Sequence, residues 1–170
     1  MHRTTSLVLP FGLSAAILAL DQATKAAVVA LVPAGTIGWS ALGDFFWLVH
    51  AKNLGIAFSV GDGLGPLLRV GLFIVLPLAL LAGVLVFYFR SREIDGFQRW
   101  VLAGIVGGGL GNQVDRIFRP EGVVDFLSFK FWGILGMERF PTFNIADSSL
   151  VVCAFLLAIS TFVADARRKP

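Results

Sequence analysis

The stretch NIADSSLVVCAFLLAISTFVA (Asn144–Ala164) decides how the fold is interpreted. Its long apolar run, Leu150–Val163, favours a buried or bilayer-crossing helix, yet Asn144 and Asp147 stand in its opening turn. Asn144 can cap the helix, and an acid three residues later complements the positive helix N-terminus. A capping role is therefore the first interpretation of Asp147, and the rest of the chain must decide whether it is sufficient.

The composition is that of an integral membrane protein. Of 170 residues, 56% are hydrophobic and only 15% are charged, against about 25% charged residues in soluble proteins. Four stretches reach the roughly 20 residues that a bilayer-crossing helix needs, and they cover 7–31, 67–89, 100–118 and 145–164. We therefore predict an all-α membrane protein with four transmembrane helices in a single domain, 1–170. Pro77, inside the second span, predicts a local kink.

Two segments between the spans are more than linkers. In the loop Val32–Pro66, the aromatic and β-branched stretch DFFWLVHAKN (Asp44–Asn53) is typical of a strand or an interfacial segment. The loop Arg119–Asn144 contains the apolar stretch VVDFLSFKFWGILGMERF, which predicts a piece lying in the membrane interface. The first segment is thus expected to be a strand or an interfacial piece, and only the second is expected specifically in the membrane interface.

The distribution of Lys and Arg predicts that both chain ends are cytoplasmic. The N-terminus, the second loop and the C-terminus hold Arg3, Arg90, Arg92, Arg99, Arg167, Arg168 and Lys169, whereas the two longer loops hold only Lys52, Arg119, Lys130 and Arg139. Cytoplasmic loops are enriched in these residues, so the two longer loops face outward. The cytoplasmic flanks explain the net charge of +3, and no nucleic-acid partner is implied. A cleaved signal peptide is disfavoured, because the first apolar pattern continues past Asp21 and Lys25 to Leu31.

Ionisable side chains inside the predicted spans suggest a shared site, since such groups usually face a bundle interior or a functional cavity. Asp21 and Lys25 lie four residues apart on one helical face and can pair. The later polar residues are Asn112, Asp115 and Arg116, then Asp125, then Asn144 and Asp147. By the predicted topology, these later residues gather near the outer membrane face. Structural roles stay open: Asp21–Lys25 as an ion pair that locks helices, and Asp115–Arg116 as an anchor for the span end.

Glycines are frequent in the third span, at Gly104, Gly107, Gly108, Gly109 and Gly111. Their spacing matches neither G-x-G-x-x-G nor a phosphate-binding P-loop. We therefore expect them to allow close helix packing.

The residue types limit the possible chemistry. The two histidines, His2 and His50, are far apart and no G-x-S-x-G stretch occurs, so neither a metal site nor a serine nucleophile is expected, and no cofactor is implied. Two carboxyl groups, Asp125 and Asp147, remain. If they lie close together only one ionises, so one can take a proton from water while the other polarises a carbonyl. This predicts an aspartic hydrolase; a small transporter with the same groups as an ion path, or a non-catalytic scaffold, are the alternatives.

Five segments in order, DQATK (Asp21–Lys25), NLGIAFS (Asn53–Ser59), GGGLGNQVDRI (Gly107–Ile117), VVDFL (Val123–Leu127) and FNIADSS (Phe143–Ser149), resemble the lipoprotein signal peptidase family, also called signal peptidase II. The resemblance covers nearly the whole chain. Two positions depart from the usual pattern, Ile56 in place of Ala and Gln113 in place of an aliphatic residue.

The resemblance implies a membrane aspartic endopeptidase that removes the signal peptide from bacterial prolipoproteins, before a cysteine carrying a diacylglyceryl group. Asp125 and Asp147 would be the catalytic pair. The family's other polar positions would be Asn112, Arg116, Asn144, Asn53, Gly55, Asp21 and Lys25, which are expected to shape the site. The expected setting is a monomer in the bacterial cytoplasmic (inner) membrane, in contact with lipids, with its active site near the outer face.

Overall fold

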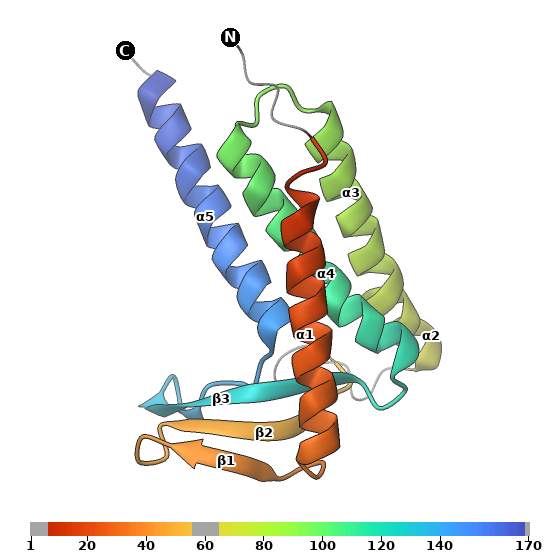
Figure 1. Cartoon of the computed structure of the whole chain (residues 1–170), viewed down its shortest axis with the longest axis vertical. Helices are drawn as coiled ribbons and strands as arrows, with labels where there is room; N and C mark the ends of the chain where they lie inside the picture. Colours follow the sequence, from red (N-terminus) through yellow and green to blue (C-terminus); the bar gives the residue numbers. More distant parts are fainter. Residues whose placement is uncertain (1–6, 56–64, 169–170) are drawn as a thin grey trace.

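The computed structural model describes residues 7–55 and 65–168, and side chains of the last helix as far as residue 166. Long helices stand side by side, and an antiparallel sheet lies across the end of the bundle opposite the start of α1 and the end of α5 (Figure 1). The elements are α1 (Phe11–Leu31), β1 (Ile37–Ala41), β2 (Phe46–Asn53), α2 (Pro66–Val70), η2 (Gly71–Val75), α3 (Leu76–Arg90), α4 (Gly96–Phe118), β3 (Val123–Ile134), β4 (Met137–Arg139) and α5 (Ile145–Arg168).

The sheet corrects the prediction of an all-α protein. Its strands pair in the order β1-β2-β3-β4, and all the pairings are antiparallel. The strand alternative for Asp44–Asn53 is confirmed by β2. The apolar stretch after α4, whose place in the membrane interface stays a prediction, forms the strands β3 and β4. Its partner β2 lies some 70 residues earlier, since Asn53 pairs with Val123, and a local sequence pattern carries no trace of so distant a pairing.

Among the described residues, three helices are long and apolar enough to cross a membrane: Phe11–Leu31, Pro66–Arg90 and Ile145–Ala166. They agree closely with three of the predicted spans. The fourth predicted span, 100–118, lies within α4, which does not reach the same apolarity. The reason is its place in the bundle, because α4 packs against α1, α3 and α5. Much of its surface therefore faces protein, and glycines and polar residues stand where a lipid-facing helix would have apolar side chains.

The glycines of α4 let its neighbours approach closely. A Cβ atom on Gly107 would lie 2.8 Å from backbone atoms of Ser14 on α1, and one on Gly108 would lie 2.6 Å from the carbonyl oxygen of Ala146 on α5. The predicted packing role of these glycines is thereby confirmed. As a result, polar side chains of α1, α4 and α5 can reach one another at the sheet end of the bundle.

Candidate active site

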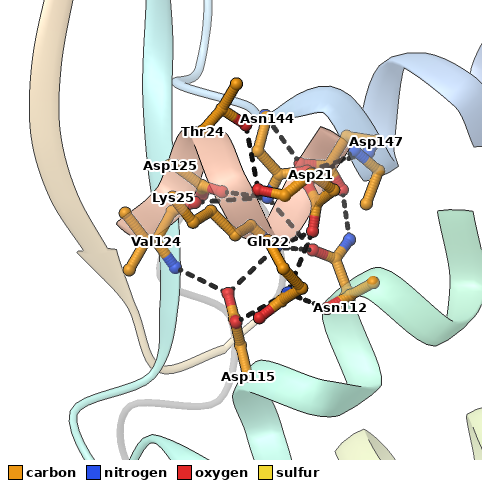
Figure 2. Close-up of polar contacts among 12 residues, drawn as sticks. Asp21, Gln22, Thr24, Lys25, Asn112, Asp115, Val124, Asp125, Asn144 and Asp147 are labelled. Carbon is orange, nitrogen blue, oxygen red and sulfur yellow. Dashed lines mark hydrogen bonds and ion pairs between the residues drawn. The ribbon is translucent and has the colours of Figure 1, made fainter. Parts of the chain in front are cut away.

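The ammonium group of Lys25, fully buried on α1, lies at the centre of the polar cluster that Figure 2 shows. Its Nζ lies 2.8 Å from Oδ2 of Asp21 and 2.9 Å from Oδ2 of Asp115, and both carboxylates are fully buried. It also donates to Oδ1 of Asn112 at 3.0 Å. The Asp21–Lys25 pair predicted from spacing is confirmed, and it extends to α4. Because an unpaired buried charge is strongly unfavourable, this cluster holds α1 against α4.

The two carboxylates around Lys25 also accept backbone N–H groups. Asp21 Oδ1 accepts from the backbone N of Ala146 at 2.9 Å, and Asp115 Oδ2 accepts from the backbone N of Val124 at 3.2 Å. Each of these N–H groups belongs to the residue directly before one of the two candidate acids. The ion cluster therefore positions both backbone segments that carry them.

Asn144, directly before α5, connects the two candidate acids. Its Nδ2 donates to Asp125 Oδ1 at 2.8 Å, and its backbone N donates to Asp147 Oδ2 at 3.1 Å. In return, Asn144 Oδ1 accepts from the backbone N of Asp147 at 2.9 Å. The reciprocal contacts form a capping box, so the capping prediction for both residues is confirmed. Yet capping occupies only one of the two carboxyl oxygens of Asp147.

Two further amides hold the remaining oxygens of the acids. Asn112 Nδ2 donates to Asp147 Oδ1 at 2.7 Å, and Asn53 Nδ2 donates to Asp125 Oδ2 at 3.0 Å. The orientation of the Asn112 amide follows from its other contacts, because its Oδ1 accepts from Lys25 and from a second amide. Because the Oδ1 atom of Asn112 accepts these two hydrogen bonds, its NH₂ group must be the one that faces Asp147.

The carboxyl group of Asp125 has its pKa raised to about 7. Burial is the main cause, because it disfavours the charged form, and the nearby charge of Asp147 acts in the same direction. The hydrogen bonds from Asn53 and Asn144 and the charge of Lys25 oppose the shift of this pKa. The two acids thus interact electrostatically, and the pair keeps a proton up to about neutral pH.

Arg116, on α4, lies beside the acids and is held by backbone carbonyl groups. Its Nη1 donates to the Phe73 carbonyl at 3.2 Å and its Nη2 to the Gly55 carbonyl at 3.4 Å. In a regular α-helix the N–H of residue 77 would bond the Phe73 carbonyl, but Pro77 has no N–H. A π-helical turn, η2, ends at Val75, shortly before Pro77. The carbonyl oxygen of Phe73 accepts from α4 as well through Gln113 Nε2, at 3.1 Å.

A cavity of about 370 Å³ opens beside these groups, between η2, α3, α4 and α5. Most of its wall is apolar: Leu72, Phe73, Pro77, Leu80, Leu81, Val84, Ile105, Gly109 and Leu150. The rest of the wall is polar: Asn112, Gln113, Arg116 and Asp147. The cavity can therefore hold an apolar chain and place a polar group of that chain, such as a peptide bond, next to Asp147.

All nine predicted site residues belong to one connected hydrogen-bond network. Gly55 enters it because its backbone N donates to Asn53 Oδ1 at 3.0 Å. Sequence reasoning missed two members. Asp115 pairs with Lys25 and Arg119, and Gln22 donates to Asp115 at 3.1 Å. The rest of the segment Asn53–Ser59, from residue 56, lies outside the described residues.

The missed residues differ in what the sequence could offer. Asp115 lies one helical turn after Asn112 and therefore on the same face of α4, the face that contacts Lys25. This spacing alone does not identify the residue with which Asp115 pairs. Gln22 follows Asp21 directly, and a neutral amide beside a charge carries no pairing signal of its own. Both contacts become visible only once α1 and α4 are packed together.

Comparisons with known proteins agree with this arrangement. The profile of the family described as signal peptidase (SPase) II matches residues 13–163. The lipoprotein signal peptidase of Treponema pallidum (strain Nichols) is 44% identical over 152 residues, which cover 89% of this chain and 82% of that protein. The lipoprotein signal peptidase of Treponema denticola (strain ATCC 35405) is 43% identical over 169 residues, covering 99% of this chain and 97% of that protein.

Two solved structures, each described as a bacterial membrane enzyme, have similar folds. One superposes with a TM-score of 0.83 at 24% identity and covers 99% of this chain and 96% of its own. The other has a TM-score of 0.78 at 25% identity and covers 95% of this chain and 97% of its own. The fold of the chain, sheet included, is therefore that of known membrane enzymes.

The buried cluster yields a prediction about stability. Lys25→Met keeps much of the side-chain length but leaves Asp21 and Asp115 without their shared cation. Removing one partner of a buried ion pair costs about 3–5 kcal/mol. We expect a large fall in the midpoint of thermal unfolding of the purified protein in detergent.

Lys52→Met is the matched control for this measurement. The Lys52 ammonium lies 4.0 Å from Glu121, and both side chains are exposed, so its loss should cost less than about 1 kcal/mol. Equal unfolding midpoints for the two variants would show that the buried cluster does not hold the helices together.

Proposed function

The chain belongs to the signal peptidase II family, the lipoprotein signal peptidases, and from this membership we propose that Asp125 and Asp147 are its catalytic pair. The protein is accordingly a membrane protease that removes the signal peptide from lipoprotein precursors. A transporter or a non-catalytic scaffold, both possible from composition alone, do not agree with this family. The proposal concerns the aspartic mechanism and the residues that carry it out.

One observation carries the proposal: Asn144 bonds both acids at once, from its side chain to Asp125 and from its backbone to Asp147. Two carboxyl groups that accept hydrogen bonds from the same asparagine and repel each other electrostatically have the arrangement that aspartic hydrolysis needs. The adjoining apolar cavity, which Asp147 lines, supports a substrate with an apolar segment.

In the proposed mechanism, Asp147 is the general base and Asp125 the general acid. Asp147 lies in the first turn of α5, where the helix N-terminus favours a negative charge. Burial favours the protonated form of Asp125 and raises its pKa to about 7. The helix terminus beside Asp147 separates the two roles, since burial acts on both acids and the proton belongs to the pair as a whole.

The reaction then proceeds in two steps, attack by water and collapse of the intermediate, and each acid transfers a proton in both steps. Asp147 takes a proton from a water molecule, whose oxygen attacks the carbonyl carbon of the scissile peptide bond, while Asp125 gives its proton to the carbonyl oxygen. When the tetrahedral intermediate collapses, one of its two hydroxyl groups returns a proton to Asp125, the C–N bond breaks, and the leaving nitrogen receives the proton held by Asp147. The products are the carboxyl end of the signal peptide and the free amino group of the mature protein. Both acids return to their starting forms.

The substrate fits the cavity in its chemistry. We propose that the bond cut is the one before a cysteine that carries a diacylglyceryl group. The polar part of the cavity wall, which includes Asn112 and Arg116, would lie next to the peptide group. The apolar part, with Leu80, Val84 and Ile105, would contact the signal segment or an acyl chain. The expected further partners are membrane lipids, and we expect a monomer to suffice because every site residue comes from one chain.

We propose that the enzyme lies in the bacterial inner membrane, with four spans and both termini in the cytoplasm. With its 23 residues, α4 is about 34 Å long at 1.5 Å per residue, which exceeds the roughly 30 Å of a hydrocarbon core. Figure 1 shows that α3 ends and α4 begins at the end of the bundle opposite the sheet, and these helix ends carry Arg90 and Arg99. The positive-inside rule then puts the sheet and the acids at the outer face.

The catalytic proposal predicts the effect of two isosteric substitutions. Asp147→Asn and Asp125→Asn keep the shape and polarity of the side chain but remove the group that transfers a proton. Each should lower cleavage of a lipid-modified prolipoprotein by about 10²–10⁴-fold, at a normal level of membrane protein. The double variant should be little worse than either single variant, because the two acids act as a unit. The rate of signal-peptide release, measured by mass spectrometry, tests this.

Asp44→Asn is the matched control. Asp44 lies in the β1–β2 turn with a φ of 67°, a conformation that Asn adopts readily, so the same substitution should leave cleavage unchanged. Near-normal cleavage by Asp147→Asn, at equal protein level, would return Asp147 to the role of a helix cap.

A second prediction concerns pH. If Asp125 supplies a proton, cleavage should decline as the pH rises through about 7, where that carboxyl group loses its proton. The hydrogen bond from Asn53 favours the charged form and so lowers this pKa. Asn53→Ala should therefore raise the pKa of Asp125 and move the alkaline decline to higher pH. The test is the cleavage rate of both proteins measured from acid to alkaline pH. An alkaline decline of Asn53→Ala at lower pH than that of the wild-type protein would contradict the assignment.

The topology makes a third prediction. A reporter domain fused after Pro170 or inserted between Ser91 and Asp95 should be found in the cytoplasm. The same reporter inserted in the β1–β2 turn, between Leu42 and Phe45, should be found outside. An external reporter at the C-terminus would refute both the topology and the outer position of the acids.

A further inference from the structure

The side chain of Gln113, on α4, has a buried oxygen atom that lacks a hydrogen-bond donor. Gln113 lines the apolar cavity beside Asp147 and is only 4% exposed. Its Nε2 donates to the Phe73 carbonyl at 3.1 Å. Its Oε1 has no hydrogen-bond partner among the described residues. Because buried polar atoms are nearly always hydrogen-bonded in folded proteins, this oxygen calls for an explanation.

The orientation of the Gln113 amide follows from the carbonyl group that it contacts. The Phe73 oxygen can only accept hydrogen bonds, so the NH₂ group of Gln113 must be the end that faces it. Exchanging the two ends of the amide would place Oε1 against that carbonyl oxygen and lose the bond. The oxygen is therefore the end of the amide that remains available to an occupant of the cavity.

The unpaired groups of the cavity wall limit what the occupant can be. Gln113 Oε1 needs a donor, and the buried Nε–H of Arg116, three residues later, has no acceptor among the described residues. A polypeptide backbone supplies both a donor N–H and an acceptor C=O at every residue except proline. An acyl chain and its ester group contain no N–H or O–H, so they cannot donate to Gln113.

We propose that Gln113 is a further substrate-binding residue, whose Oε1 accepts a hydrogen bond from a backbone N–H of the signal peptide shortly before the bond that is cut. The inference rests on the proposed function, because it places the cut beside Asp147, which lines the same cavity. A backbone N–H that enters a mostly apolar cavity loses its water and needs an acceptor from the protein. The wall at Gln113 therefore contacts the signal segment, and not an acyl chain.

The test replaces single backbone N–H groups of the substrate by oxygen. Three lipid-modified prolipoprotein peptides each carry an ester in place of one of the three peptide bonds before the one that is cut. For each enzyme, kcat/KM of the all-amide peptide is divided by that of each ester peptide, so the amount of folded protein cancels. We expect a wild-type ratio of about ten at one position, because the ester removes a hydrogen bond and leaves Oε1 buried without a donor.

Two substitutions of Gln113 separate its oxygen from its contact with Phe73. Gln113→Met has neither an acceptor oxygen nor a donor, so the ratio at that position should fall to near one. Gln113→Glu keeps an acceptor oxygen but not the NH₂ group that bonds the Phe73 carbonyl, so it should keep the wild-type ratio. Gln98→Met is the matched control. Gln98 is also buried on α4 but lies outside the cavity, so this variant should keep the wild-type ratio too.

Three results would overturn the inference. A wild-type ratio near one at all three positions does so without any variant. An unchanged ratio in Gln113→Met would show that another group accepts the N–H, and an equal fall in Gln113→Met and Gln113→Glu would assign the effect to the Phe73 contact. Normal cleavage by Asp147→Asn would refute the proposed catalytic pair without changing the wild-type ratios, so the two failures can be told apart.

Discussion

The buried positive charge of Lys25 is the constraint on which the site depends. An ammonium group without water needs negative partners, and here two carboxylates from different helices supply them. Each carboxylate has lone pairs left over, and each uses them to hold a backbone N–H, at Ala146 and at Val124. The buried charge of Lys25 on α1 thereby fixes the positions of the start of α5 and the start of β3. The candidate acids follow directly in both segments.

Capping and catalysis are compatible roles for Asp147 because a carboxyl group has two oxygens. Oδ2 completes the capping box with Asn144, whereas Oδ1 accepts from Asn112, and the residue lines the apolar cavity. The cap also has a consequence for the chemistry. A side chain locked to its own helix terminus cannot swing away from its partner, so the distance between two repelling acids is maintained without an ion or a cross-link.

The helices and the candidate acids could be predicted from the sequence, because both leave local signals. Apolar length marks the spans, and a carboxylate such as Asp21 inside a span is rare enough to draw attention. The sheet and the role of Asp115 could not be predicted in the same way. The pairing of Asn53 with Val123 joins distant segments, and Asp115 meets Lys25 only because Gly107 and Gly108 allow α1, α4 and α5 to pack closely. These contacts are determined by the tertiary packing of the helices and strands and leave no local sequence signal.

The way in which Arg116 is held explains how the acids can keep a proton beside a guanidinium group. A direct ion pair with Arg116 would stabilise the charged form of Asp125 and lower its pKa, and the pair would then lose the proton that general acid catalysis needs. Here the guanidinium group is bonded to the carbonyl oxygens of Phe73 and Gly55. One of these carbonyls is available because Pro77 supplies no N–H to it. A proline in an apolar helix thus provides a neutral acceptor for the arginine, and the pKa of Asp125 can remain near 7.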